Sequence, residues 1–208
     1  QLNNTTDAVD WPDISAEAQQ QQLPDWQRLR QPLSAIEQSA LAPQQQWRYD
    51  TLLSDLEQRL VLAPFTPLAL DLSGPDAWQR RIAQTLMTQH PVERISDVYD
   101  YIDRLQGAAE LLNRWREQWQ QADNGFLPPR AQFDQAIKDI NELLTGFPFD
   151  ANNQQLSPLW ADIRGKIIAL ELYPSSQRVL LQRTQQALTG DFYTAFSALV
   201  SQLQQTAE

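Results

Sequence analysis

Residues 125–130, Gly-Phe-Leu-Pro-Pro-Arg, stand between two long amphipathic helical patterns. Gly125 suits the left-handed residue that ends a helix, Pro128 prevents continuation, and Pro129 is suited to start the next helix. Apolar residues recur at helical spacing on both sides, over about 27 residues or about 40 Å of helix upstream. They are Val98, Ile102, Leu105, Ala109, Leu112 and Trp119 before the turn, and Phe133, Ile137, Ile140 and Leu144 after it. This stretch therefore predicts a helical hairpin.

The sequence before this hairpin predicts a polar arm followed by two helices. Residues 1–11 lack periodicity and are expected to fray. One helix is expected over residues 16–36, and a second from Pro43, whose missing N–H costs nothing in a first helical turn. The candidate caps of the first helix are Asp13 and Ser15, and the prolines expected to kink or divide it are Pro24 and Pro32.

Helical patterns continue through the rest of the chain. A short helix is expected over residues 76–87, and Ser96 is expected to cap the long helix before the hairpin turn. Ser157-Pro158 has the order of a cap and a first-turn proline, so it predicts another helix start. Pro174 and Gly190 are expected to separate the last helices.

The composition predicts an all-α fold. Gln and Leu are good helix formers and dominate the regular stretches, only 6 of 208 residues are Gly, and no stretch alternates Val, Ile and Thr as a strand would. We expect about seven helices in antiparallel hairpins, forming an irregular helical bundle. Residues 12–208 are interpreted as one helical domain after the 1–11 arm, with a sub-division near residues 88–95 as an alternative.

Charge and composition argue against several classes of partner. The net charge is −10 and no Lys/Arg cluster is present, so the chain lacks the basic face that nucleic-acid binding requires. There is no Cys, and no apolar run approaches the ~20 residues that span a bilayer, so no transmembrane segment is expected. The chain opens on Gln1 without a hydrophobic signal segment, which is expected of a processed or trimmed chain.

Few residues form a pattern that predicts chemistry. His90 is the only His and is interpreted as a loop residue satisfied by solvent or by a backbone carbonyl, not as a metal ligand. Asp97, Asp100 and Asp103 favour a solvated helix end matched to the helix dipole over an acid/base or calcium site. No Gly-x-Ser-x-Gly elbow and no Gly-rich phosphate loop is present. We therefore expect no catalytic residue, no metal ligand and no cofactor in this chain.

An aromatic and basic cluster near the predicted hairpin tip is a candidate binding surface. Its members are Trp115, Trp119 and Phe126 with Arg114, Arg116 and Arg130. A cation–π ligand surface is one interpretation, whereas core packing under the Arg stems is the favoured one. The candidate binding residues are Arg130, Trp119 and Phe126.

Several stretches occur in an order that carries a family resemblance. They are Trp11-Pro12-Asp13-Ile14-Ser15 with the run from Ala42 to Glu57, then Val98 to Leu105, Gly125 to Arg130, and Tyr193 to Leu203. The third is close to a Gly-x-x-x-Pro-Pro-Arg pattern. Together they cover most of the chain, which resembles a bacterial family known only as domain of unknown function 885.

Full-length members of that family are longer and resemble zinc metallopeptidases through a later His-Glu-x-x-Pro-Gly-His motif. Nothing here matches the motif, so no catalytic or metal residue is carried over. The resemblance implies a non-catalytic helical accessory region that packs against, or walls the cleft of, a downstream catalytic region. It also implies a periplasmic or cell-envelope setting, with a lipid anchor possible in the precursor. The alternative is a self-sufficient peptide- or protein-binding helical module.

Overall fold

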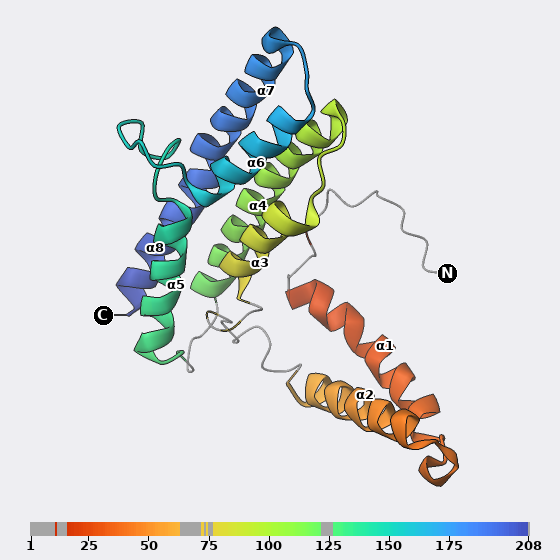
Figure 1. Cartoon of the computed structure of the whole chain (residues 1–208). Helices are drawn as coiled ribbons and strands as arrows, with labels where there is room; N and C mark the ends of the chain where they lie inside the picture. Colours follow the sequence, from red (N-terminus) through yellow and green to blue (C-terminus); the bar gives the residue numbers. More distant parts are fainter. Residues whose placement is uncertain are drawn as a thin grey trace. The chain divides into compact units, whose positions relative to one another are not determined.

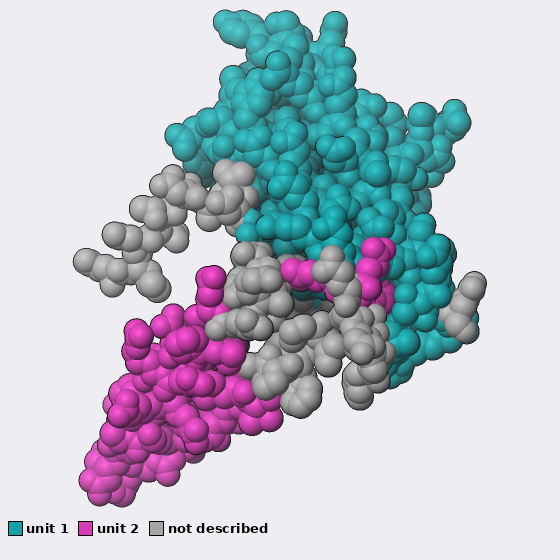
Figure 2. All heavy atoms as spheres, turned by 180° about the vertical axis from the view of Figure 1, so that it is seen from behind, with its two compact units in different colours: residues 1–12, 70–117, 125–208 teal, residues 13–69, 118–124 magenta. Residues whose placement is uncertain are grey.

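The computed structural model describes Trp11, residues 16–62, Leu72, Gly74, residues 77–121 and residues 127–207. These residues form helices and loops with no strand among them, so the predicted all-α class is confirmed. Figure 2 shows two compact units, one of residues 13–69 and 118–124 and the other of residues 1–12, 70–117 and 125–208. Residues 88–95 lie inside the larger unit.

The smaller unit contains α1 (Ala16–Ser34) and α2 (Pro43–Leu62), which pack against each other (Figure 1). The second helix begins at Pro43, as predicted. The connection includes the helical turn η1 (Gln38–Ala40), and Gln38 Nε2 donates a hydrogen bond of 2.8 Å to Asp50 Oδ1. Gln46 Nε2 donates to the carbonyl oxygen of Leu41 at 2.9 Å. Amide side chains of the Gln-rich sequence thus satisfy polar groups of this turn.

The two prolines of α1 do not divide the helix, although division was one of the two outcomes that the sequence predicted. The helix continues through Pro24 and Pro32 to Ser34. Both prolines are exposed, so water can hydrogen-bond to the carbonyl groups that they leave unpaired. The proposed caps, Asp13 and Ser15, lie outside the described residues.

The long helix α4 (Ile95–Gln121) contributes a broad apolar face to the core of the larger unit. At 100° per residue, the buried positions cover about 160° of its circumference. They include Val98, Tyr101, Leu105, Ala108, Ala109, Leu111 and Leu112. Arg116 joins α4 to α8 (Tyr193–Thr206), because its Nε donates to Gln202 Oε1 at 3.1 Å.

The return helix of the predicted hairpin is α5 (Arg130–Leu143), which packs against α3 (Trp78–Gln84) and α8. Pro129 occupies its N-cap position, one residue before the helix, and Gly125 lies outside the described residues. The buried residues of α5 are Phe133, Ala136, Ile140 and Leu143. Two of the four predicted apolar positions, Phe133 and Ile140, are therefore buried, whereas Ile137 and Leu144 are half-buried.

The loop after α5 is closed by backbone contacts that require a glycine. Gly146 has φ of +99°, and a Cβ there would lie 2.6 Å from the Gln155 carbonyl oxygen. The Phe147 N–H donates to that same carbonyl at 2.8 Å. Close backbone approach and left-handed φ together exclude larger residues at position 146.

The last three helices begin and end close to the predicted positions. α6 (Pro158–Ala169) starts as expected, with Ser157 Oγ accepting a 3.3 Å hydrogen bond from the Trp160 N–H. α7 (Pro174–Ala187) packs against α6 and continues into the wide helical turn η4 (Leu188–Phe192), which leads into α8. Gly190 has non-helical angles (φ −89°, ψ −122°), so it interrupts the regular helix without opening a loop.

The predicted cap Ser96 lies inside the first turn of α4, which begins one residue earlier at Ile95, and the carboxylate of Asp97 in this turn binds the backbone before the helix. Asp97 Oδ2 accepts hydrogen bonds from the N–H groups of Glu93 at 2.8 Å and Arg94 at 3.0 Å. The Ser96 hydroxyl instead donates to Asp97 Oδ1 at 3.2 Å. A carboxylate is the stronger acceptor for these N–H groups, and it complements the positive end of the helix.

Trp11, the last residue of the predicted polar arm, is anchored on α4. Its Nε1 donates a 2.8 Å hydrogen bond to the carbonyl oxygen of Arg104. The indole lies over Gly107, where an added Cβ would be 2.9 Å from Trp11 Cδ1. The missing side chain at position 107 therefore makes room for this ring.

We predict that Gly107→Ala displaces the Trp11 indole and breaks its hydrogen bond to Arg104. Loss of about 1 kcal/mol should speed hydrogen exchange at the Trp11 indole N–H by about fivefold. Indole resonances in ¹⁵N NMR spectra measure this exchange directly. Gly165→Ala is the matched control, because nothing lies within 4 Å of a Cβ there. Equal exchange in both variants would contradict the proposed steric role of Gly107.

Candidate functional site

His90 lies in a partly buried polar cluster formed by η3 (Thr85–Gln89), α4 and α6. Its side chain is only 5% exposed, and its Nε2 lies 2.7 Å from the carbonyl oxygen of Asp97. Because a carbonyl only accepts, Nε2 carries the ring hydrogen of the neutral imidazole. The ring also packs edge-on against Tyr101, with centroids 5.4 Å apart. The interpretation of His90 as a residue satisfied by a backbone carbonyl agrees with this contact.

Lys166 binds the end of η3 from the neighbouring helix α6. Its Nζ donates hydrogen bonds to the carbonyl oxygens of Leu86 (3.3 Å), Met87 (2.8 Å) and His90 (3.0 Å). The same Nζ lies 2.8 Å from Asp162 Oδ2, one turn earlier on α6. A cation here satisfies carbonyl groups that have no partner within the helix and complements its negative end.

Tyr101 is the most enclosed titratable group of the cluster. Its side chain is 0% exposed, and its hydroxyl has no hydrogen-bond partner among the described residues. Burial raises the pKa of Tyr101 strongly, and the negative charge of Asp162 raises it further. The phenol therefore stays protonated at physiological pH and has no adjacent base that would make it a nucleophile.

The three regularly spaced carboxylates at the start of α4 have different surroundings. Burial alone would raise the pKa of Asp97, but hydrogen bonds from the Glu93 backbone, Arg94 and Ser96 lower it to about 2. Asp100 is half-buried and Asp103 is exposed. Over the part of the chain that the structure describes, no three His, Cys, Asp or Glu side chains gather as a metal-binding group.

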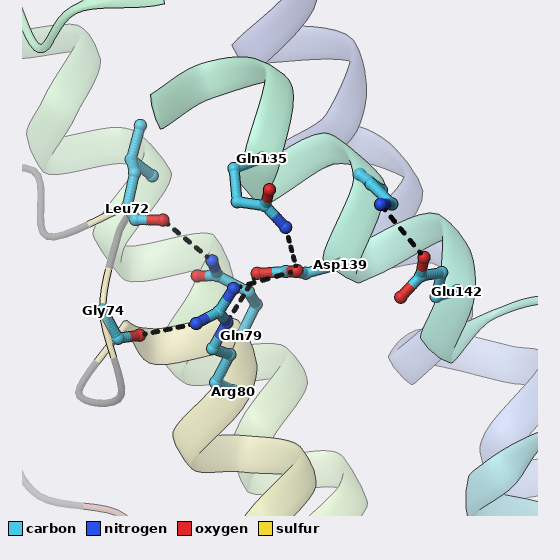
Figure 3. A network of polar contacts seen from close by, with 8 residues as sticks. Leu72, Gly74, Gln79, Arg80, Gln135, Asp139 and Glu142 are labelled. Atoms are coloured by element: carbon cyan, nitrogen blue, oxygen red, sulfur yellow. Dashed lines mark hydrogen bonds and ion pairs between the residues drawn. The ribbon is translucent and has the colours of Figure 1, made fainter. Parts of the chain in front are cut away.

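A second polar network joins α3 to α5 (Figure 3). Arg80 donates to both carboxylate oxygens of Asp139, at 2.7 and 3.2 Å, and Gln135 Nε2 donates to the same carboxylate at 2.8 Å. Burial opposes ionisation of Asp139, but these hydrogen bonds prevail and lower its pKa. Gln79 extends the network to the Leu72 carbonyl at 3.1 Å. Every group is paired within the protein, so the arrangement joins helices rather than forming a ligand site.

The smaller unit carries a different feature, an apolar groove between α1 and α2. Its volume is about 470 Å³, and it is lined by Trp26, Leu29, Pro32, Leu33, Ile36, Leu52, Asp55, Leu56 and Arg59. Leu29 and Leu52 are 54% and 58% exposed. The charged residues of the groove, Asp55 and Arg59, pair with each other at 2.8 Å. The groove therefore offers apolar surface with little net charge, a combination suited to another apolar surface.

The aromatic and basic residues near the predicted hairpin tip differ in their exposure. Trp119 is only 5% exposed and Trp115 only 9%, which agrees with the core interpretation. Arg130 is exposed and lies 4.0 Å from Asp134 on its own helix. Phe126 lies outside the described residues.

Sequence reasoning did not identify Tyr101, Asp162 and Lys166 as members of a cluster. The Asp162–Lys166 pair alone had a local sequence signal, because oppositely charged residues four apart can pair on a helix. The partners of Lys166 on η3 are 76 to 80 residues away in the sequence. Only the packing of α6 against η3 brings them together.

Comparison with known proteins gives one match. Residues 3–208 match a family described as a bacterial protein of unknown function (DUF885). No curated protein and no solved structure matches the chain significantly. In the described residues, no helix is both long and apolar enough to cross a membrane.

We predict that Lys166→Met lowers the free energy of unfolding by about 1–3 kcal/mol, because it leaves three carbonyl groups and Asp162 without their cation. Urea unfolding at pH 7 measures the change. Lys138→Met is the matched control, since Lys138 is exposed and lies 3.9 Å from Glu142, and it should change stability by less than ~0.5 kcal/mol. Similar losses in the two variants would refute the structural role of Lys166.

We also predict that Asp97→Asn removes a pH-dependent part of the stability. The lowered pKa of Asp97 means that its contribution is complete above its ordinary pKa of 3.8 and is lost as pH falls towards about 2. The wild-type protein should therefore be more stable than the variant at pH 7, and the difference should shrink below pH 3.8. Urea unfolding across this range tests it, with exposed Asp103→Asn as control. A difference independent of pH would contradict the prediction.

Proposed function

Because the chain belongs to the DUF885 family of bacterial proteins of unknown function, we propose that it is a non-catalytic helical accessory region. In this proposal it packs against, or walls the cleft of, a downstream catalytic region in a metallopeptidase-like parent protein. The peptidase-like parent and a periplasmic or cell-envelope location rest on the sequence resemblance alone. No catalytic residue, metal ligand or cofactor is assigned to this chain.

The observation that carries the proposal is the apolar surface that the α1–α2 hairpin leaves exposed by its own packing. Among the described residues of these two helices, only Tyr49 and Leu56 are buried apolar side chains. Three large apolar side chains that line the groove are exposed instead: Leu29, Ile36 and Leu52. Contiguous exposed apolar surface is typical of an interaction site. Because helices gain most of their stability in proteins from tertiary packing, such a hairpin is best stabilised by a further apolar surface.

The rival proposal, a self-sufficient binding module, is favoured by the shape of the same face. The space between Leu33 on α1 and Leu56 on α2 is a groove, and an amphipathic peptide helix can place its apolar face into such a groove. Because Asp55 and Arg59 at the groove pair with each other, a peptide that binds there would not need a particular charge. The two proposals therefore differ in the occupant, not in the surface.

We predict that Leu29→Lys with Leu52→Lys weakens binding of a separately produced downstream region by at least about tenfold, or about 1.4 kcal/mol. Burying two ammonium groups against an apolar partner is costly, whereas both positions tolerate charge in the free protein because they are exposed. Isothermal titration calorimetry measures the dissociation constant. The matched control is Val179→Lys on α7, which is 47% exposed and outside the hairpin.

Three outcomes separate the proposals. Binding of the downstream region that only the hairpin variant weakens supports the accessory role. Binding of amphipathic peptides in the groove, without binding of the downstream region, supports the independent module. Equal weakening by the hairpin and α7 variants, or no binding at all, would reject the α1–α2 face as the docking surface.

A further inference from the structure

The connection between η3 and α4 is held by contacts that meet at His90. The side chain of His90 donates to the Asp97 carbonyl on α4, and its backbone carbonyl accepts from Lys166 on α6 at 3.0 Å. The carboxylate of Asp97 binds the N–H groups of Glu93 and Arg94 in the same connection. The connection between η3 and α4 is thus held by contacts with α4 and α6, and His90 takes part in the contacts with both helices.

Charged groups face His90 from both helices packed against it. From α4 these are Asp97, Asp100 and Arg104, with the neutral ring of Tyr101 beside them, and from α6 it is Lys166, whose ion-pair partner is Asp162. The connection itself contributes Glu93 and Arg94, and Arg94 pairs with Asp97 at 3.0 Å. Asp162 is likewise paired with Lys166. The carboxylates of Asp97 and Asp162 are therefore both engaged and are not free to pair with a protonated imidazole.

We propose that His90 is the proton-sensing element of a latch that holds residues 85–94 against α4 and α6 and opens when the imidazole is protonated. The protonated ring would be a cation in a site that excludes water, close to the ammonium of Lys166 and the guanidinium of Arg104. Moving the ring into water relieves this cost but breaks the Nε2–Asp97 hydrogen bond and the contact with Tyr101. Because Lys166 holds the carbonyl of the same residue, movement of His90 also weakens the attachment of η3 to α6.

The direction of the pH effect follows from the environment of the ring. Burial lowers the pKa of His90 from 6.5, Arg104 and Lys166 lower it further, and the Asp97 carbonyl and Asp100 oppose the shift. The neutral ring therefore stabilises the closed latch fully above pH 6.5, and this contribution is lost as pH falls towards the lowered pKa. The chain has one His and no Cys, so few other side chains titrate near neutral pH.

Hydrogen exchange measured by mass spectrometry on the full chain from pH 7.5 to 5.5 tests the latch. After correction for the intrinsic pH dependence of exchange, amides in residues 85–94 should show an opening equilibrium that rises by up to about tenfold per pH unit below pH 6.5. Amides in α8 serve as the internal reference and should stay protected. His90→Gln keeps an amide donor for the Asp97 carbonyl but cannot be protonated, so its exchange should not depend on pH in this range.

A direct titration of the imidazole keeps the proposal testable if His90→Gln fails to fold. NMR of the wild-type protein gives a single imidazole titration, which should lie below pH 6.5 and coincide with the rise in exchange. Wild-type exchange that is independent of pH, an equal rise in His90→Gln, or a rise that does not follow the imidazole titration would each overturn the latch. The latch would be established if exchange in the wild-type protein rises together with the imidazole titration and this rise is absent in His90→Gln.

Discussion

Coverage of the apolar face of α4 is the constraint on which the larger unit depends. This face extends along a helix of about 40 Å, so shorter helices must cover it in succession. The buried residues of α5, α6 and α8 include Phe133, Ile140, Leu159, Ile163, Phe196 and Leu199. Helices that end against a buried face leave carbonyl or N–H groups away from water, and these groups need partners. Lys166 of α6 meets that need at the end of η3 and Asp97 meets it at the start of α4, which explains why the cluster around His90 lies at helix ends.

Local sequence signals predicted the helices because each signal acts within a few residues. Pro43 and Ser157-Pro158 begin helices where caps and first-turn prolines are expected, and two of the four periodic positions of the return helix, Phe133 and Ile140, are buried. Helix boundaries were predicted less well. Ser96 is not the cap because α4 begins one residue earlier, at Ile95, and the exposed prolines leave α1 undivided.

The candidate site was less predictable because its contacts join residues far apart in the chain. The sequence showed His90 as the only His and suggested a carbonyl partner, but it could not show that Lys166 binds the same residue from 76 positions away. Trp11 likewise contacts Arg104 across 93 positions and depends on the absence of a side chain at Gly107. Such contacts depend on helix packing, and no periodic pattern encodes them. The Trp115 and Trp119 positions, by contrast, followed the rule that aromatic residues at helical spacing pack in a core.

The exposed side chains of α5 in the larger unit differ from those of the hairpin in the smaller unit. This difference bears on the proposal that the hairpin packs against a partner. In the larger unit, exposed positions of α5 carry charged pairs such as Lys138–Glu142, as expected of surface in contact with water. In the hairpin, the charges pair with each other at Asp25–Arg28 and Asp55–Arg59, while Leu29 and Leu52 remain more than half exposed. A helical layer is stable when its apolar stripe lies against another layer. The exposed Leu29 and Leu52 are therefore the observation behind the proposal that another apolar surface packs against the hairpin.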